Sequence, residues 1–173
     1  MVAARCYRDG KPVSGINTKI IRKVEANPDV KVTKLLPGIS YSYYVGNWDS
    51  IPEFQNLKPL KEGILGNFIL DPKTAKEYYG FSFKGYINIP ASDMYAFYTN
   101  SDDGSTLWID GKKLVDNDGL HGSKEIESDI GLMKGYHQIR IDYFNKTGSD
   151  GLTVSIRSTT LKKQAVPGSI LFH

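Results

Sequence analysis

Residues 105–115, STLWIDGKKLV, contain the clearest fold signal in the chain, because two runs of β-type composition flank Asp110-Gly111. An Asp-Gly pair tolerates the positive φ angles of the tight turns that join antiparallel strands, so this stretch predicts a β-hairpin. Successive residues of a strand face opposite sides of a sheet. Either Trp108 or the two aliphatic residues beside it therefore face the core, and a packing role for Trp108 is favoured over stacking on a ligand.

The sequence on both sides repeats this pattern. Short alternating runs rich in Tyr, Phe, Ile and Val are separated by Gly, Asp and Asn, which is typical of strands joined by turns. The runs are ISYSYYVG (39–46), FSFKGYINIP (81–90), MYAFYTN (94–100), YHQIRIDYF (136–144) and LTVSIRS (152–158). Helical signal is restricted to one short turn near 52–57, which Pro59 ends. The sequence thus predicts an all-β protein, an antiparallel sandwich or barrel.

The first residues form a separate unit in this interpretation. Two strand-like runs surround DGKPVSG (9–15), and a single hairpin is only marginally stable alone. EANPDVKVTKLLPG (25–38) follows, with two prolines that limit regular structure. We expect residues 1–27 to be the terminal hairpin of a truncated preceding β domain, 28–36 to be a linker, and 37–173 to be the main sandwich.

Composition excludes several classes of function. The 173 residues are 40% hydrophobic, enough for a core, and carry a net charge of +3 with acids and bases interleaved. No basic run predicts binding to nucleic acid or membranes, and no apolar run is long enough to span a bilayer. Cys6 is the only cysteine, so there is no internal disulfide and no thiolate metal site. The start lacks the apolar core of a signal peptide, so we expect any targeting segment to lie outside this sequence.

Five aspartates lie between residues 101 and 122, in SDDGSTLWIDGKKLVDNDGLHG. Asp110 fits the hairpin turn, and Asp116 and Asp118 fit turn or capping roles in the loop that follows. Asp102 and Asp103 are neighbours, which makes them a poor acid/base pair, because adjacent side chains of a strand diverge.

Other chemistries fit this segment less well. No serine lies in a nucleophile-elbow motif, and histidines are too few for a zinc site. The remaining donors are oxygens, which calcium prefers. Two adjacent aspartates bind one ion only if the backbone turns both carboxylates to one side, for which a cis peptide would suffice. An ordinary turn remains the alternative.

The segments YSYYVGNW, IPEFQNLKP, MYAFYTNSDDGSTLWIDGKKLVDNDGLHG and GLMKGYHQIRIDYFNKTGSDGLTVSI resemble the PA-fourteen domain family over roughly residues 37–172. The resemblance implies a β-sandwich of jelly-roll-like topology. In lectins of this family the aspartates that match Asp102 and Asp103 are joined by a cis peptide and bind calcium, which coordinates sugar hydroxyls. The matching later loop, FNKTGSDG, implies Asn145 as a further calcium ligand and sugar contact, and Asp150 as an additional carbohydrate-binding candidate. His121 is a further candidate for sugar contact, because it lies in the loop GLHG, where a ligand could meet it.

The amino-terminal stretch VAARCYRDGKPVSG resembles the end of the chitobiase/β-hexosaminidase carboxy-terminal accessory domain. This implies a parent glycoside hydrolase acting on amino-sugar glycans. The leading hypothesis is therefore a non-catalytic, calcium-assisted carbohydrate-binding module, with a glycan and the catalytic domain of the same polypeptide as partners, located outside the cell or in the periplasm. The alternatives are a structural spacer that binds no sugar, and part of a hydrolase active site.

Overall fold

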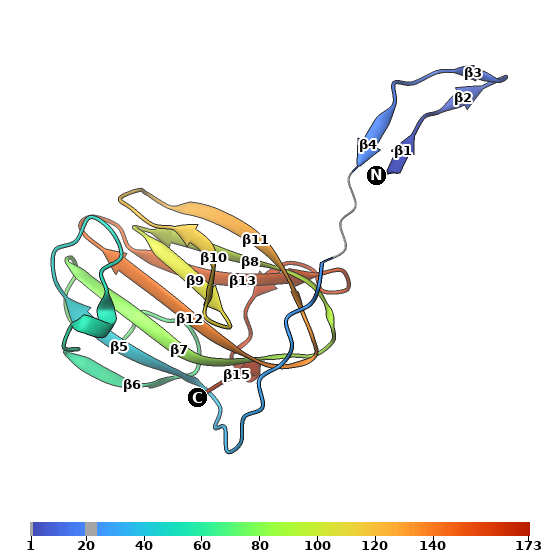
Figure 1. Cartoon of the computed structure of the whole chain (residues 1–173). Coiled ribbons are helices and arrows are strands. Elements are labelled where there is room, and N and C mark those ends of the chain that lie inside the picture. The colour runs from blue at the N-terminus through green and yellow to red at the C-terminus, as the bar shows by residue number, and fades with distance from the viewer. Residues whose placement is uncertain (1, 20–23) are drawn as a thin grey trace.

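The computed structural model describes residues 2–19 and 24–173, and these form antiparallel sheets with two short 3-10 turns, Phe54–Asn56 and Gly168–Ile170 (Figure 1). The larger sheet of the main unit has the strand order β10 (Lys112–Asn117), β9 (Ser105–Ile109), β12 (Gly135–Asn145), β7 (Tyr79–Ile89), β5 (Ile39–Val45) and β6 (Lys61–Leu65), and β15 (Leu171–Phe172) also pairs with β7. The smaller sheet has the order β11 (Lys124–Leu132), β8 (Asp93–Asp102), β13 (Gly151–Ser158) and β14 (Gln164–Ala165). The predicted all-β antiparallel sandwich is confirmed. None of the described segments is a helix long and apolar enough to cross a membrane.

The core lies between the two sheets and is rich in aromatic rings. Tyr79, Phe81 and Phe83 alternate along β7 and are fully buried. The rings of Phe81 and Phe83 are stacked, with centroids 5.4 Å apart, and Tyr43 of β5 packs 5.0 Å from Phe81. Alternation along the central strands therefore buries the side of the larger sheet that faces the second sheet, as expected for a β-sandwich.

The β9–β10 hairpin has the predicted Asp-Gly turn. Asp110 and Gly111 have φ angles of 49° and 76°. The aliphatic residues beside Trp108 are fully buried, so the indole lies on the opposite, outer face of the larger sheet. The Asp110 carboxylate also accepts a hydrogen bond from the Gln138 backbone N–H, 3.0 Å away, and contacts Nδ1 of buried His137 at 2.8 Å. Asp110 thus combines a turn role with a tertiary contact.

Three connections cross between the two sheets at the same end of the sandwich. They are residues 103–104 between β8 and β9, 118–123 between β10 and β11, and 146–150 between β12 and β13. A side chain at Gly104 would place its Cβ 2.5 Å from the Phe144 ring and 2.9 Å from the Gly119 nitrogen. The first crossing is this compact only because residue 104 is glycine.

The amino-terminal residues form small separate ladders. β1 (Val2–Ala4) pairs with β4 (Asn17–Lys19), and β2 (Tyr7–Arg8) pairs with β3 (Lys11–Pro12). In the described ranges none of these strands pairs with a strand of the sandwich. The chain then contacts the sandwich, because Asn27 bridges to Leu132 and the Val30 N–H donates to the Tyr136 carbonyl at 2.8 Å.

Candidate functional site

Asp102 and Asp103 lie where the chain leaves β8, and the peptide bond between them is cis. Asp103 is 7% exposed, and its two carboxylate oxygens bind two different loops. Oδ1 accepts a hydrogen bond from the backbone N–H of His121 at 3.1 Å, and Oδ2 accepts one from the backbone N–H of Lys146 at 2.9 Å. One side chain therefore connects all three sheet-crossing segments.

The backbone extends this connection across the end of the larger sheet. The Lys146 carbonyl accepts a hydrogen bond from the Tyr78 N–H at 2.9 Å, and the Tyr78 carbonyl accepts one from the Gly46 N–H at 2.8 Å. The loops after β5 and before β7 are thus joined to the crossing that contains Asp103. This network holds the loops in a defined arrangement around the aspartate pair.

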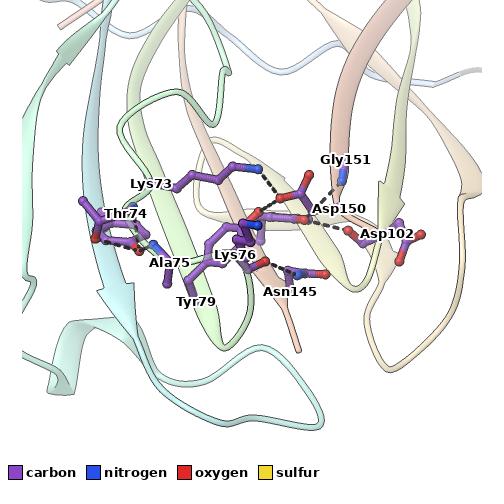
Figure 2. A network of polar contacts seen from close by, with 11 residues as sticks. Lys73, Thr74, Ala75, Lys76, Tyr79, Asp102, Asn145, Asp150 and Gly151 are labelled. Atoms are coloured by element: carbon purple, nitrogen blue, oxygen red, sulfur yellow. Dashed lines mark hydrogen bonds and ion pairs between the residues drawn. The ribbon is translucent and has the colours of Figure 1, made fainter. Parts of the chain in front are cut away.

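Asp102 differs from Asp103 in its surroundings. Its carbonyl accepts a 2.6 Å hydrogen bond from the buried Tyr143 hydroxyl, which itself accepts one from the Gly151 N–H at 3.3 Å (Figure 2). No hydrogen bond to its carboxylate is present among the described residues. Burial and the adjacent Asp103 charge raise the pKa of the Asp102 carboxyl above its usual value. The site therefore holds negative charge that the protein's own donors leave uncompensated.

Asn145 is the last residue of β12 and is fully buried. Its side-chain NH₂ donates to the Lys76 carbonyl at 3.4 Å. Its Oδ1 is buried and has no hydrogen-bond partner in the described part of the chain. In Figure 2 this oxygen points away from Lys76, toward the side of the site where Asp102 lies. A buried amide oxygen without a donor is unusual, because burial without a partner costs about 1–3 kcal/mol.

Asp150 forms an ion pair with Lys73 and accepts a hydrogen bond from the Tyr79 hydroxyl at 2.5 Å (Figure 2). Burial raises the pKa of the Asp150 carboxyl, but the hydrogen bonds from Lys73 and Tyr79 outweigh it and leave the pKa below its usual value. Asp150 also lines a cavity of about 330 Å³ together with Asp102, Ser123 and Thr153. A polar hollow thus opens directly beside the aspartate pair.

The pairing of Lys73 with Asp150 predicts a pH-dependent stability difference. A carboxyl group whose pKa is depressed by folding stabilises the native state above its unfolded pKa, and this contribution is lost as pH falls through the folded pKa. We expect Lys73→Met to reduce stability at pH 7 by about 1 kcal/mol, with a deficit that shrinks below pH 4. Urea unfolding from pH 7 to pH 3 measures it, and a constant deficit would contradict the assignment.

His121 lies in the 118–123 crossing and contacts Asp103 through its backbone N–H, whereas its ring faces its own loop. Nε2 lies 3.0 Å from the Asn117 carbonyl oxygen and Nδ1 lies 2.9 Å from that of Gly122. The five residues suggested by sequence for ligand binding therefore lie at one end of the sandwich. Four supporting residues carried no recognisable sequence signal: Lys73, Tyr79, Tyr143 and Lys146.

The chemistry of this end is that of oxygen donors. In residues 2–19 and 24–173, no three His, Cys, Asp or Glu side chains gather closely enough to hold a metal ion by themselves. Any cation here would need further oxygen ligands in addition to Asp102 and Asp103, such as amide oxygens, carbonyl oxygens or water. Asn145 supplies such an oxygen.

The family model described as "PA14 domain" matches residues 37–167, most of the chain and the whole of the site described above. The chain belongs to the PA14 domain family. This confirms the resemblance on which the site residues were first selected. The match covers both sheets of the sandwich, whereas the hairpin β1–β4 lies outside the matched range.

Two curated relatives match this chain over part of their own length. The chain is 26% identical over 136 residues to the anti-sigma-I factor RsgI3 of Acetivibrio thermocellus, covering 78% of this chain and 21% of that protein. It is 24% identical over 150 residues to a β-hexosaminidase of Porphyromonas gingivalis, covering 81% of this chain and 19% of that protein. The chain therefore spans about a fifth of the length of these relatives.

Solved structures show the same PA14 fold. An anti-sigma factor domain-containing protein superposes with a TM-score of 0.69 at 23% identity, covering 83% of this chain and 50% of that one. A PA14 sugar-binding domain from an RTX adhesin superposes with a TM-score of 0.65 at 15% identity, covering 80% of this chain and 99% of that one. At these identities the likeness establishes the fold alone.

Proposed function

We propose that this PA14 module is a non-catalytic carbohydrate-binding module that binds glycan through a calcium ion. Asp102, Asp103 and Asn145 would hold the ion. The observation that carries the proposal is the buried, unpartnered Oδ1 of Asn145 at the same end of the sandwich as two adjacent carboxylates. The sugar-binding PA14 domain of the RTX adhesin, which has the same fold, supports it.

The residues present fit a calcium ion in three respects. Calcium takes carboxylate, amide and carbonyl oxygens, and these are the donors at this end of the sandwich. The raised pKa of the Asp102 carboxyl, caused by burial and by Asp103, indicates negative charge that a cation would neutralise. The Asn145 oxygen gains in such a complex the partner that the protein does not provide.

When bound, calcium would supply a Lewis-acidic centre to which sugar hydroxyls coordinate. The protein's own residues would position the calcium ligands and the sugar. Asp103 holds the crossing loops together through the His121 and Lys146 N–H groups, and Tyr143 holds the Asp102 carbonyl. The adjoining cavity of about 330 Å³, with Ser123 and Asp150 in its wall, accommodates part of a sugar.

The names of the two curated relatives bear on the parent protein. The β-hexosaminidase match favours an accessory module of a glycoside hydrolase, which would keep the enzyme near its glycan and act outside the cytoplasm. The anti-sigma-I factor match favours a second candidate, a recognition module within a regulatory protein. An anti-sigma factor and a β-hexosaminidase have no activity in common. A binding role therefore explains the matched region in both proteins better than a catalytic role does.

The proposal is tested by calorimetric titration of the protein with a panel of monosaccharides and disaccharides. We expect binding in millimolar calcium that disappears with a chelator and in Asp102→Ala. The conservative surface change Lys162→Arg serves as the control and should bind normally. Sugar binding that is unchanged by chelation would contradict the calcium mechanism. No binding to any sugar, with stability indifferent to calcium, would favour a structural spacer.

A further inference from the structure

A second polar surface lies on the outer face of the larger sheet, and neither Asp102 nor Asp103 lines it. Trp108 of β9 pairs laterally with Lys113 of β10 and with Arg140 of β12. Arg140 in turn pairs with Lys84 of β7, which pairs with Ser40 of β5. Because laterally paired residues of a sheet share a face, these five side chains form one row across five strands.

Residues of this row line two cavities. The larger, of about 510 Å³, is lined by Ser40, Lys84, Gln138 and other residues of the sheet. The smaller, of about 310 Å³, lies between the sheet and the segment that contains Gln55. Trp108 and Arg140 line both cavities. We call the two together the sheet-face groove, and its length suits an extended ligand better than a compact one.

The indole of Trp108 is held in a defined position within the groove. The Arg140 guanidinium lies 4.8 Å from the ring centroid and the Lys113 ammonium lies 5.7 Å from it. The indole N–H donates to the Thr106 hydroxyl at 3.2 Å. A rigid aromatic ring presents a large apolar contact at low entropic cost, which is why such rings act as anchors in binding sites.

Two of the three cationic side chains of the row are paired with carboxylates, whereas Lys84 forms no ion pair among the described residues. Arg140 forms an ion pair with buried Asp142 at 2.6 Å, and the other Asp142 oxygen accepts a hydrogen bond from Ser82 at 2.7 Å. Lys113 pairs with Asp116 at 2.9 Å. Because two of the three cations of the row are compensated, the groove favours a weakly charged ligand over a strongly ionic one. The hydroxyl and amide groups that line the groove, together with an indole, instead complement a ligand that carries many hydroxyls on apolar rings.

We propose that the sheet-face groove binds an extended, uncharged polysaccharide chain, with Trp108 as its aromatic anchor. The groove contains none of the residues assigned to calcium, so binding here is independent of the metal and of the proposed function at Asp102 and Asp103. A polysaccharide bound along the sheet would attach the module to a polymer. The end of the sandwich that contains Asp102 and Asp103 would recognise a terminal or branching sugar.

Intrinsic fluorescence gives a direct test, because the sequence contains only two tryptophans. The rings of Trp48 and Phe54 pack edge-on with centroids 5.8 Å apart, so Trp48→Phe retains an aromatic contact and leaves Trp108 as the only tryptophan, which is excited selectively at the red edge of the absorption band. Asp102→Ala is added and a chelator is present, so that the calcium-dependent site does not contribute. We expect hydroxyethyl cellulose or xyloglucan to change Trp108 emission in a saturable manner, and polygalacturonate to have a weaker effect.

Affinity gel electrophoresis with the same polymers measures the contribution of the anchor. In chelator we expect Trp108→Ala to weaken binding by about tenfold or more, and Gln138→Ala, an exposed change in the larger cavity, to weaken it several-fold. Tyr7→Ala, an exposed aromatic of the amino-terminal hairpin, is the matched control and should bind as the parent does. Circular dichroism establishes that each variant is folded.

Three outcomes would overturn the inference. The first is no emission change with any neutral polymer, as expected if another protein domain covers the groove. The second is a response to polygalacturonate alone, which would identify an anionic ligand. The third is retention of full affinity by both Trp108→Ala and Gln138→Ala. Loss of calcium-dependent sugar binding with an intact Trp108 response would refute only the proposed function.

Discussion

Asp102→Asn is expected to weaken calcium binding by about tenfold or more, about 1.4 kcal/mol, and to abolish calcium-dependent sugar binding. The substitution keeps the shape of the side chain and removes one negative charge from the pair. Because no described hydrogen bond involves the Asp102 carboxylate, the change leaves the loop contacts of Asp103 and the Tyr143 contact to the Asp102 carbonyl in place. The loss would therefore report on the ion and not on folding.

The stability of the calcium-free protein should change in the opposite direction. Folding raises the pKa of the Asp102 carboxyl through burial and the adjacent Asp103 charge. A carboxyl group with a raised folded pKa contributes stability that is present below its unfolded pKa and is lost as pH rises through the folded pKa. We therefore expect calcium-free Asp102→Asn to unfold at a higher temperature than the calcium-free parent at pH 7, and calcium to stabilise the parent more than the variant.

Differential scanning calorimetry with and without calcium, together with calcium titration, measures both effects. Asp116→Asn is the matched control, because Asp116 is an exposed aspartate of β10 that takes no part in the contacts of Asp102 and Asp103. Equal stabilisation of parent and Asp102→Asn by calcium would show that the ion binds elsewhere. A calcium-free variant less stable than its parent would show that Asp102 has a structural role absent from the contacts described above.

Phe81→Ala is expected to produce the largest loss of stability, about 3–5 kcal/mol. Phe81 is fully buried at the centre of β7, stacks on Phe83, and contacts Tyr43 and Tyr79. Its removal leaves a cavity that aromatic neighbours cannot fill without leaving their rotamers. Because domains are stable by only about 5–15 kcal/mol, this loss is a large share of the total.

Urea denaturation and thermal melting measure the effect of Phe81→Ala. At about 2–4 °C per kcal/mol for a chain of this size, the melting temperature should fall by about 10 °C. Met94→Ala, at a side chain 37% exposed on β8, is the control and should change stability by less than about 0.5 kcal/mol. A fall in melting temperature no larger than that of the control would mean that the two sheets are not held together through this aromatic cluster.

Local sequence was sufficient for the hairpin and for the fold class. Asp110-Gly111 predicted its turn because the φ requirement of a tight hairpin is local, and alternation along 105–109 limited Trp108 to one of two faces. Which face was decided by packing, since Leu107 and Ile109 fill the core and the indole lies outside it. Trp108 therefore packs on the outer face, where its ring contacts Lys113 and Arg140, and not in the core.

The site was less accessible to sequence analysis. The family resemblance selected Asp102, Asp103 and Asn145, and these residues do lie at the same end of the sandwich. The residues that support them were missed, because Lys73 and Tyr143 reach Asp150 and Asp102 across 77 and 41 positions of sequence. Contacts of that separation leave no periodic pattern in one sequence.

The sequence by itself determined which segments are strands, where they turn, and which family the residues from 37 onward resemble. These properties depend on φ preferences, alternation and motif spacing, all of which act over a few residues. Only the tertiary structure decided that three sheet crossings meet around Asp103, that the Asn145 oxygen is buried without a partner among the described residues, and that Trp108 faces a groove. Those features arise from the packing of two sheets and the positions at which strands cross between them, and these are set by long-range contacts.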